Sequence, residues 1–148
     1  MQIKKLTEQN LESLINLENQ LFENPFNTNS ILSELNQTNR LYLGLFDNDE
    51  NLIAYAGASL NFDFADIIKV GVEKQHQGKG YGKQVLLELL KELKKLDIFD
   101  VLLEVEHQNY KALNLYLSVG FKEISERKNY YGLNSHAKIL KLEQKIEN

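Results

Sequence analysis

A short segment with three glycines, QGKGYG at residues 77–82, constrains this chain more than any other feature of its sequence. Glycine loses more conformational freedom on folding than any other residue, so three glycines in five positions predict unusual dihedral angles or a close approach of another group. Residues 65–72 before it have the length and apolar content of a strand. After it, Val and Leu repeat at helical spacing at positions 85, 86, 89, 90, 93 and 96. The sequence therefore predicts a strand, a glycine-rich turn and a helix in succession.

A helix that starts in such a turn favours an anionic ligand at its beginning. Its first N–H groups have no partner within the helix, and the positive end of its dipole lies there. Lys79 and Lys83 add positive charge. The Walker A pattern does not fit, because it needs a glycine at Gln77 and a serine or threonine at Gln84. The dinucleotide pattern does not fit either, since Lys83 takes the place of its third glycine. A phosphate-binding turn and a plain flexible turn both remain open.

The remaining pattern is that of a mixed α/β chain. The expected elements are a strand at 2–6, a helix at 8–22 that ends before Pro25, a second helix capped by Asn29 or Ser30, a hairpin of strands at 40–47 and 52–62, a strand at 65–72, the striped helix, a strand at 99–106, a helix at 109–120 and two closing strands at 121–132 and 136–144. No linker, repeat or low-complexity tract interrupts them, so residues 1–148 are expected to form one domain.

Composition excludes several classes of function. The net charge of −4 does not resemble the basic surface of a nucleic-acid-binding protein. The absence of cysteine excludes disulfides, thiolate zinc sites and a thiol nucleophile. His76, His107 and His136 lack the spacing of metal ligands, so no metal is expected. No signal peptide or run of about 20 apolar residues is present. We therefore expect a cytoplasmic protein that contacts neither nucleic acid nor membrane. The composition does not bear on the oligomeric state, for which our expectation is a monomer.

The Q-x-x-G-x-G pattern at 77–82 resembles the pyrophosphate loop of the GNAT superfamily of N-acetyltransferases. Downstream, the chain is similar to the C-terminal half of that family's signature, through Glu104, Asn109, Tyr116 and Gly120-Phe121. The stretch RKNYYG at 127–132 resembles the RimI-like branch, as does LFENPFNTNS at 21–30, although Phe26 and Asn27 replace its usual Trp and Ser. The resemblance spans most of the chain.

This resemblance implies a GNAT fold, an α/β fold with a central, mostly antiparallel twisted sheet of about seven strands flanked by about four helices. It implies acetyl-CoA as co-substrate, whose acetyl carbonyl is held by free amides of the strand before the glycine turn, with Val72 N–H as donor. Gly71 stands where relatives usually carry alanine. The implied coenzyme-binding residues are Val70, Gly71, Val72, Gln77, Gly78, Lys79, Gly80, Tyr81, Gly82, Lys83 and Asn109.

The resemblance also implies roles for four side chains. Glu104 is the candidate base, Tyr116 the candidate acid, and Tyr130 and Tyr131 candidate contacts to the acceptor. The residues alone allow plainer roles: a solvated strand carboxylate, a packed helical ring and half-buried strand aromatics, with Asn109 as a helix cap.

The implied acceptor is the N-terminal α-amine of a protein, and in RimI-type enzymes it is the N-terminal alanine of a small-subunit ribosomal protein. A small-molecule amine or a lysine side chain, and a non-catalytic acyl-CoA-binding module, remain alternatives.

Overall fold

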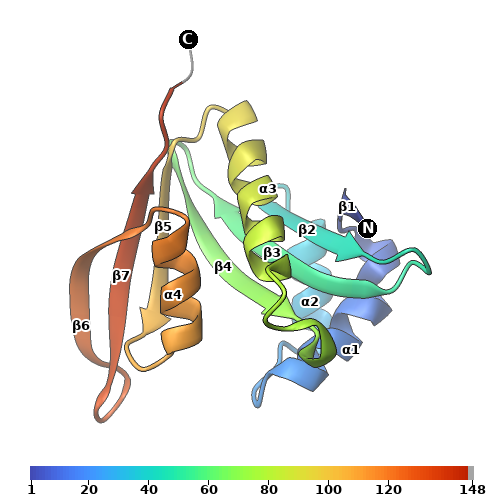
Figure 1. The fold of residues 1–148 in the computed structure, drawn as a ribbon, viewed down its shortest axis with the longest axis horizontal. Coiled ribbons are helices and arrows are strands. Elements are labelled where there is room, and N and C mark those ends of the chain that lie inside the picture. Colours follow the sequence, from blue (N-terminus) through green and yellow to red (C-terminus); the bar gives the residue numbers. More distant parts are fainter. Residues whose placement is uncertain (147–148) are drawn as a thin grey trace.

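The computed structural model describes residues 1–146, so the last two residues of the expected domain lie outside it. Within this range, seven strands form one sheet in the order β1-β2-β3-β4-β5-β7-β6, with four α-helices around it (Figure 1). The strands are β1 (Gln2–Lys5), β2 (Arg40–Phe46), β3 (Leu52–Leu60), β4 (Phe64–Val72), β5 (Asp100–Glu106), β6 (Lys122–Gly132) and β7 (Ser135–Glu143). The helices are α1 (Leu11–Leu21), α2 (Thr28–Asn36), α3 (Tyr81–Lys95) and α4 (Tyr110–Ser118), with short 3-10 turns η1 (Glu8–Asn10) and η2 (Lys74–His76). The expected mixed α/β fold is confirmed.

The sheet opens between its two central strands. All neighbouring strands are antiparallel except β4 and β5, which pair in parallel. This pairing includes only Phe64–Asp66 on β4 and Asp100–Leu102 on β5. Beyond these residues the two strands diverge, which gives the sheet the V shape seen in Figure 1. One half of the sheet contains β1 to β4, and the other contains β5 to β7.

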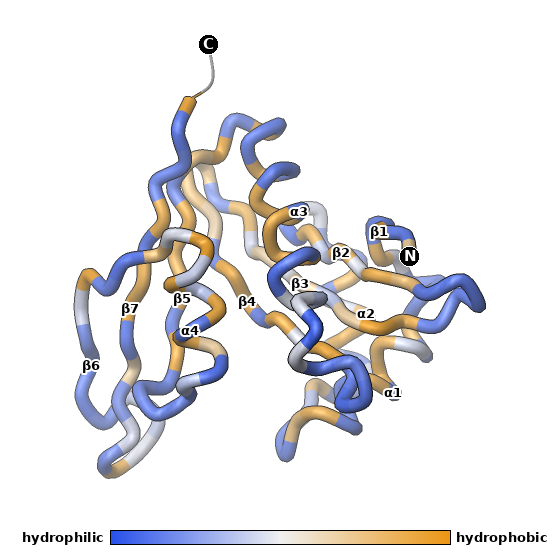
Figure 2. Tube along the Cα trace, in the orientation of Figure 1, coloured by the Kyte–Doolittle hydropathy of each residue, from blue (hydrophilic) through white to orange (hydrophobic). Residues whose placement is uncertain are grey.

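Helices cover both faces of the sheet. The larger core joins the apolar residues of α3 and α4 to one face, whereas the smaller core joins α1 and α2 to the other. Helix α3 alternates between hydrophobic and hydrophilic residues (Figure 2), and the predicted stripe is buried at Val85, Leu86, Leu89, Leu90 and Leu93. Leu96 of that prediction follows the helix and is 53% exposed.

The N-terminal helices differ in detail from the sequence prediction. The expected helix at 8–22 begins with the 3-10 turn η1, and α1 starts only at Leu11. The predicted cap of the second helix at Asn29 or Ser30 was wrong. Asn27 is the cap, because its side-chain oxygen accepts a hydrogen bond from Ser30 N–H at 2.8 Å. An N-cap side chain accepts a hydrogen bond from an amide two or three residues after it. Asn27 stands in that position relative to Ser30, so Ser30 lies inside the first turn of the helix and does not cap it.

The edge strand β6 is exposed along its whole length. Its register with β7 is regular near Lys122, shifts before Ser125, and shifts again between Arg127 and Gly132. Residues 128–131 therefore do not continue the regular ladder, and the tip of the hairpin presents them beside the open end of the V.

Candidate active site

The glycine turn holds two residues in the left-handed region, Gly78 at φ +78° and Gly80 at φ +85°. A residue with a Cβ atom is strained there, which explains the glycine at each position. Gly80 is the N-cap of α3 and caps it without a side chain. The first helical hydrogen bond runs from Gln84 N–H to the Gly80 carbonyl. The amides of the first turn before Gln84 thus have no acceptor within the helix and are directed at the start of α3.

Two contacts fix this turn against β4. The Gln77 side chain donates from Nε2 to the Val72 carbonyl at 3.0 Å. Gly82 lies so close to β4 that a Cβ atom there would be 3.2 Å from a methyl group of Val72 and 3.7 Å from one of Val70. The third glycine is therefore explained by close packing of the helix start on the strand rather than by its dihedral angles.

The backbone of β4 offers hydrogen-bonding groups to the gap of the V. Glu73 N–H donates to the Ile53 carbonyl of β3 at 2.8 Å. In an antiparallel pair, alternate residues direct their N–H groups to the same neighbour. Gly71 therefore bonds toward β3, and the N–H groups of Val70 and Val72 are directed away from it. On that side β5 has already separated from β4, so these two amides face the gap.

A cavity of about 740 Å³ lies between the glycine turn, β4 and α4. Nine of the predicted coenzyme residues line it: Val70, Val72, Gln77, Gly78, Gly80, Tyr81, Gly82, Lys83 and Asn109. Lys79 and Gly71 do not. The sequence interpretation missed His76 and, on α4, Lys111, Ala112, Asn114 and Leu115. Helical spacing from Asn109 to Tyr116 could have indicated Ala112, which lies between them on the same face.

Gly71 faces the opposite side of β4. A Cβ atom at this position would lie 2.7 Å from the ring of Tyr55 and 3.0 Å from a methyl group of Leu21. The glycine that replaces the alanine usual in relatives is therefore matched by a tyrosine ring that fills the space.

Tyr116 lines the same cavity from α4. Its ring is buried and packs edge-on against Phe121, with centroids 5.8 Å apart. Burial raises the pKa of Tyr116 to about 12, so the phenol keeps its proton at neutral pH. The packing role and a proton-donor role are compatible in this position.

Asn109 caps α4, because its side-chain oxygen accepts a hydrogen bond from Ala112 N–H at 3.3 Å. The same side chain lies on the wall of the cavity. The amide nitrogen is not used by the cap, so a helix cap and a ligand contact do not exclude each other.

Glu104 does not line this cavity. On β5, Val101, Leu103 and Val105 join the core under α3 and α4, so strand alternation directs Glu104 to the opposite face of the sheet. Its carboxylate is partly exposed and lies 3.7 Å from Nη1 of Arg127 on β6. The two predicted catalytic side chains therefore approach the V from opposite faces.

The tip of the β6–β7 hairpin brings aromatic side chains to the face of Glu104. Tyr130 and Tyr131 are about half exposed and pack edge-on, with centroids 5.0 Å apart. The guanidinium of Arg127 lies 5.6 Å from the Tyr130 ring. Burial raises the pKa of Tyr131, and the negative charge of Glu104 raises it further, which places the two groups in the same electrostatic environment.

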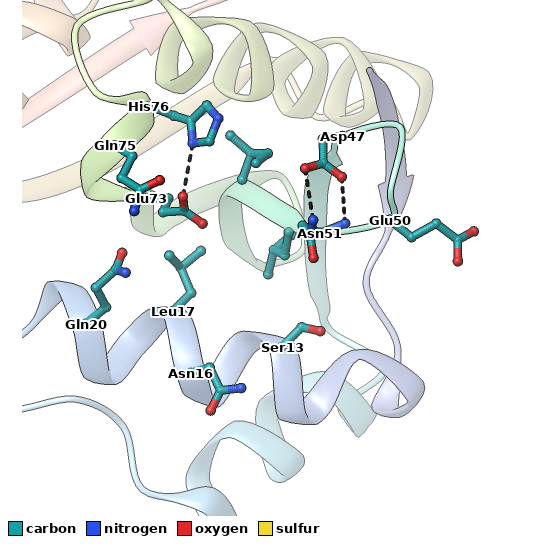
Figure 3. A pocket seen from close by; sticks show the side chains of 12 residues that line it. Ser13, Asn16, Leu17, Gln20, Asp47, Glu50, Asn51, Glu73, Gln75 and His76 are labelled. Carbon is teal, nitrogen blue, oxygen red and sulfur yellow. Dashed lines mark hydrogen bonds and ion pairs between the residues drawn. The ribbon is translucent and has the colours of Figure 1, made fainter.

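A second, polar cavity of about 380 Å³ lies between α1, the β2–β3 turn and η2 (Figure 3). Figure 3 shows His76 paired with Glu73, with Nδ1 of the histidine 3.1 Å from Oε1 of the glutamate. It also shows Asp47 accepting hydrogen bonds from Asn51. These bonds lower the pKa of Asp47. His76 lines both cavities, but no other predicted or missed site residue reaches this one.

Within residues 1–146, no helix is long and apolar enough to cross a membrane. Nor does this part of the chain bring together three or more His, Asp or Glu side chains in a way that could hold a metal ion.

Known proteins are similar to this chain in sequence and in fold. Residues 11–121 match the Acetyltransferase (GNAT) family. The ribosomal protein bS18-alanine N-acetyltransferase of Haemophilus ducreyi is 33% identical over 130 residues, which cover 87% of this chain and 88% of the relative. The N-alpha-acetyltransferase RimI of Mycobacterium tuberculosis is 32% identical over 136 residues, covering 87% and 83%. The crystal structure of the ribosomal-protein-S18-alanine N-acetyltransferase from Escherichia coli matches with a TM-score of 0.89 at 26% identity, over 99% of this chain and 96% of that chain. With most of its length matched in both sequence and fold, this chain belongs to the GNAT family of acetyltransferases.

Proposed function

We propose that this protein transfers the acetyl group of acetyl-CoA to the N-terminal α-amine of a protein, and that its acceptor is the N-terminal alanine of a small-subunit ribosomal protein. The relatives named for that reaction support the choice of acceptor. The observation that carries the chemistry is the divergence of β4 and β5, with Tyr116 in the cavity on one face of the sheet and Glu104 directed to the opposite face.

The α3 face is the side for the co-substrate. The start of α3 supplies free amides and a dipole to a pyrophosphate, with Lys83 beside them. The remainder of acetyl-CoA fits the cavity along β4, where the amides of Val70 and Val72 face the gap. We assign Val72 N–H to the carbonyl oxygen of the acetyl group, where it stabilises the negative charge that develops during attack.

The acceptor amine approaches from the face of Glu104. An α-amine has an ordinary pKa of about 7.7–8.0, so a carboxylate base, directly or through water, suffices to remove its proton. The amine nitrogen bonds to the acetyl carbon as the carbon–sulfur bond breaks. Tyr116 gives its proton to the departing thiolate and regains one from solvent. Acetylated amine and free coenzyme A leave, and no covalent intermediate on the protein is required.

We assign Tyr130 and Tyr131 to acceptor binding, because both rings are about half exposed and Tyr131 lies within the electrostatic influence of Glu104. The net charge of −4 suits a basic ribosomal protein as partner. We also propose that residues 1–148 act as one domain and as a monomer in the cytoplasm, without nucleic acid or membrane as partner.

The test is release of free thiol from acetyl-CoA in the presence of defined peptides. We expect rapid release with a peptide that begins with alanine, and none when the same peptide has a blocked N-terminus. Release with the blocked peptide only when it contains lysine would instead favour the side-chain acceptor. If calorimetry showed tight acetyl-CoA binding but no free thiol were released with any peptide or small amine, the non-catalytic acyl-CoA-binding module would be the remaining alternative.

A further inference from the structure

A buried ionic cluster lies on the α1 side of β4, outside the cavity described above. Glu18 of α1 is the one charged residue that is fully buried among residues 1–146. Its carboxylate accepts a hydrogen bond from the Tyr55 hydroxyl at 2.6 Å and pairs with Nζ of Lys69 at 3.1 Å. Burial and the adjacent carboxylate both raise the pKa of Tyr55, so the phenol remains the donor.

The same ammonium group contacts two aromatic rings. Nζ of Lys69 lies 4.0 Å from the ring centroid of Phe22 and 4.0 Å from that of Phe26. Phe22 follows the last residue of α1, and Phe26 lies just before α2. Both distances are within the range of a cation–π interaction, and Lys69 is largely shielded from solvent. One cation therefore joins α1, the α1–α2 connection and β4.

A bulge in β4 brings Lys69 to this face. Lys69 pairs with Gly57 of β3 and Ile67 pairs with Ala58, so Ile68 is an extra residue between them. Ile67 joins the core under α3, and simple alternation would send Lys69 to that same side. The bulge reverses the alternation. Lys69 then faces Glu18, while the next residue, Val70, lines the proposed acetyl-CoA cavity.

This face is the one left for the acceptor. The cavity lined by Val70 and Tyr116 lies on the α3 side, so an amine that meets the acetyl group through the gap must come from the α1 side, where Glu104 is directed. On that side, Arg127 of the β6–β7 hairpin lies 3.7 Å from Glu104. Phe22 and Phe26 of the α1–α2 connection pack against Lys69 of β4. We therefore take the hairpin and residues 22–26 as the two sides of the acceptor entrance. This step rests on the proposed function.

We propose that Lys69 is a positioning residue for the acceptor: its ammonium group holds residues 22–26 against β4 and thereby sets one wall of the acceptor entrance. The geometry requires a cation, because only a positive charge both pairs with Glu18 and is attracted to the two ring faces. Removal of the cation leaves the fold of β4 in place but releases the connection between α1 and α2.

The central comparison uses three variants. Lys69→Arg keeps a cation that stacks on aromatic rings and pairs with a carboxylate. Lys69→Met removes the cation but leaves Glu18 buried without its ion-pair partner, which itself destabilises. The double variant Glu18→Gln, Lys69→Met removes both charges together. Lys4→Met is the matched control, because Lys4 Nζ lies 4.4 Å from the ring centroid of Phe46, on strands remote from the gap.

We expect the double variant and Lys69→Met to raise the KM for an alanine-initiated peptide roughly ten-fold, as the loss of a desolvated cation–π pair implies. The affinity for acetyl-CoA, measured by calorimetry, should stay the same. Lys69→Arg should restore the peptide KM, and Lys4→Met should leave it unchanged. An unchanged peptide KM in the double variant would overturn the proposal. A higher peptide KM accompanied by weaker acetyl-CoA binding and a lower Tm would also overturn it, because that pattern belongs to general destabilisation.

Hydrogen exchange separates this proposal from the proposed function, because it needs no acceptor. Faster exchange at residues 22–27 in the double variant, with unchanged exchange in β4, supports the role of Lys69 in holding these residues. This result would stand even if the wild type acetylated no peptide, and then the proposed function would fail instead. Unchanged exchange at residues 22–27, in an enzyme that does acetylate peptides, removes Lys69 from this role.

Discussion

The glycine turn before α3 and the β6–β7 hairpin border the same gap, and they are built in different ways. In the turn, the groups offered to a ligand are backbone amides, held in place by a helix with five buried apolar residues. In the hairpin, the groups offered are side chains on a strand whose eleven residues are all exposed. The turn is fixed by the core of the protein, whereas the hairpin tip depends on its own contacts.

This difference separates recognition of the co-substrate from recognition of the acceptor. Backbone amides cannot be removed by a side-chain substitution, and they move only when the dihedral angles change. Exposed aromatic and charged side chains can be exchanged without cost to the core. We therefore expect many substitutions to change acceptor preference while acetyl-CoA binding stays intact. Few substitutions should change acetyl-CoA binding while acceptor preference stays the same.

The sharpest test of this separation is Glu104→Gln, which we expect to lower kcat by roughly 10²–10³-fold because general base catalysis contributes on this scale. Acetyl-CoA affinity by calorimetry should not change, since Glu104 lies outside that cavity. Glu126→Gln, on the exposed strand β6, is the control. Equal activity of the Glu104 variant and the wild type across pH 6–9 would remove Glu104 from the mechanism.

Gly80→Val changes the glycine turn on the other side of the gap, and we expect it to weaken acetyl-CoA binding by at least about a hundred-fold. A valine cannot hold φ +85° without strain. The loss of two hydrogen bonds from backbone N–H groups to a charged phosphate accounts for this magnitude. Calorimetry measures the affinity, and circular dichroism checks the fold. The control is Gly132→Val, which imposes a similar strain at φ +136° in the hairpin. Equal losses in both variants would contradict a special role for the turn.

Tyr116→Phe should lower kcat by roughly ten- to a hundred-fold, the lower part of the range for acid–base groups. Because burial raises the pKa of Tyr116 to about 12, the native enzyme should not lose this proton donor below about pH 11. The stability linked to this phenol is complete below the ordinary pKa of about 10 and is lost as the pH rises through 12. Rate profiles and alkaline unfolding of wild type and variant measure both effects, and a wild-type rate that falls with a phenol-like pKa near 9 would count against Tyr116 as the acid.

Tyr131→Ala is the mildest of these changes, and we expect only a rise in peptide KM of roughly three- to ten-fold, the scale of one aromatic contact. The fold should survive, because the ring is half exposed. Phe62→Ala, at a fully exposed ring in the β3–β4 turn, is the control. A change in acetyl-CoA affinity here would break the separation between the two sides.

The local features of the chain were predictable from the sequence because their causes are local. The glycine turn and the apolar stripe of α3 depend on residues within one or two turns of each other, and their positions agree with the structure except at Leu96. Strand alternation, another local cause, places Glu104 opposite Val101, Leu103 and Val105. Nothing in the sequence alone, however, indicated that this face is the side away from Tyr116.

The features that were missed depend on pairing between distant residues. The extra residue at Ile68 exists only because β4 pairs with β3 in a particular register, so the reversal that brings Lys69 to Glu18 cannot be seen in the β4 sequence. The cap was misplaced for a local reason, because the four consecutive polar residues 27–30 are all acceptable caps and only one of them, Asn27, is used. Arg127 was part of a recognised stretch, but its approach to Glu104 depends on how β6 bends at its register shifts.

The three residue pairs that join β4 to β5 leave the two halves of the sheet with a narrow connection. A molecule that fills the gap and forms contacts with both halves connects them where the strands do not, and so stabilises the native state. Any ligand that binds only the native state adds about 2.7 kcal/mol to stability at a hundred-fold excess over its Kd. We therefore expect the lifetime of this protein against proteolysis to lengthen when acetyl-CoA is abundant and to shorten when it is scarce, so that the amount of enzyme follows the metabolic supply of the group it transfers.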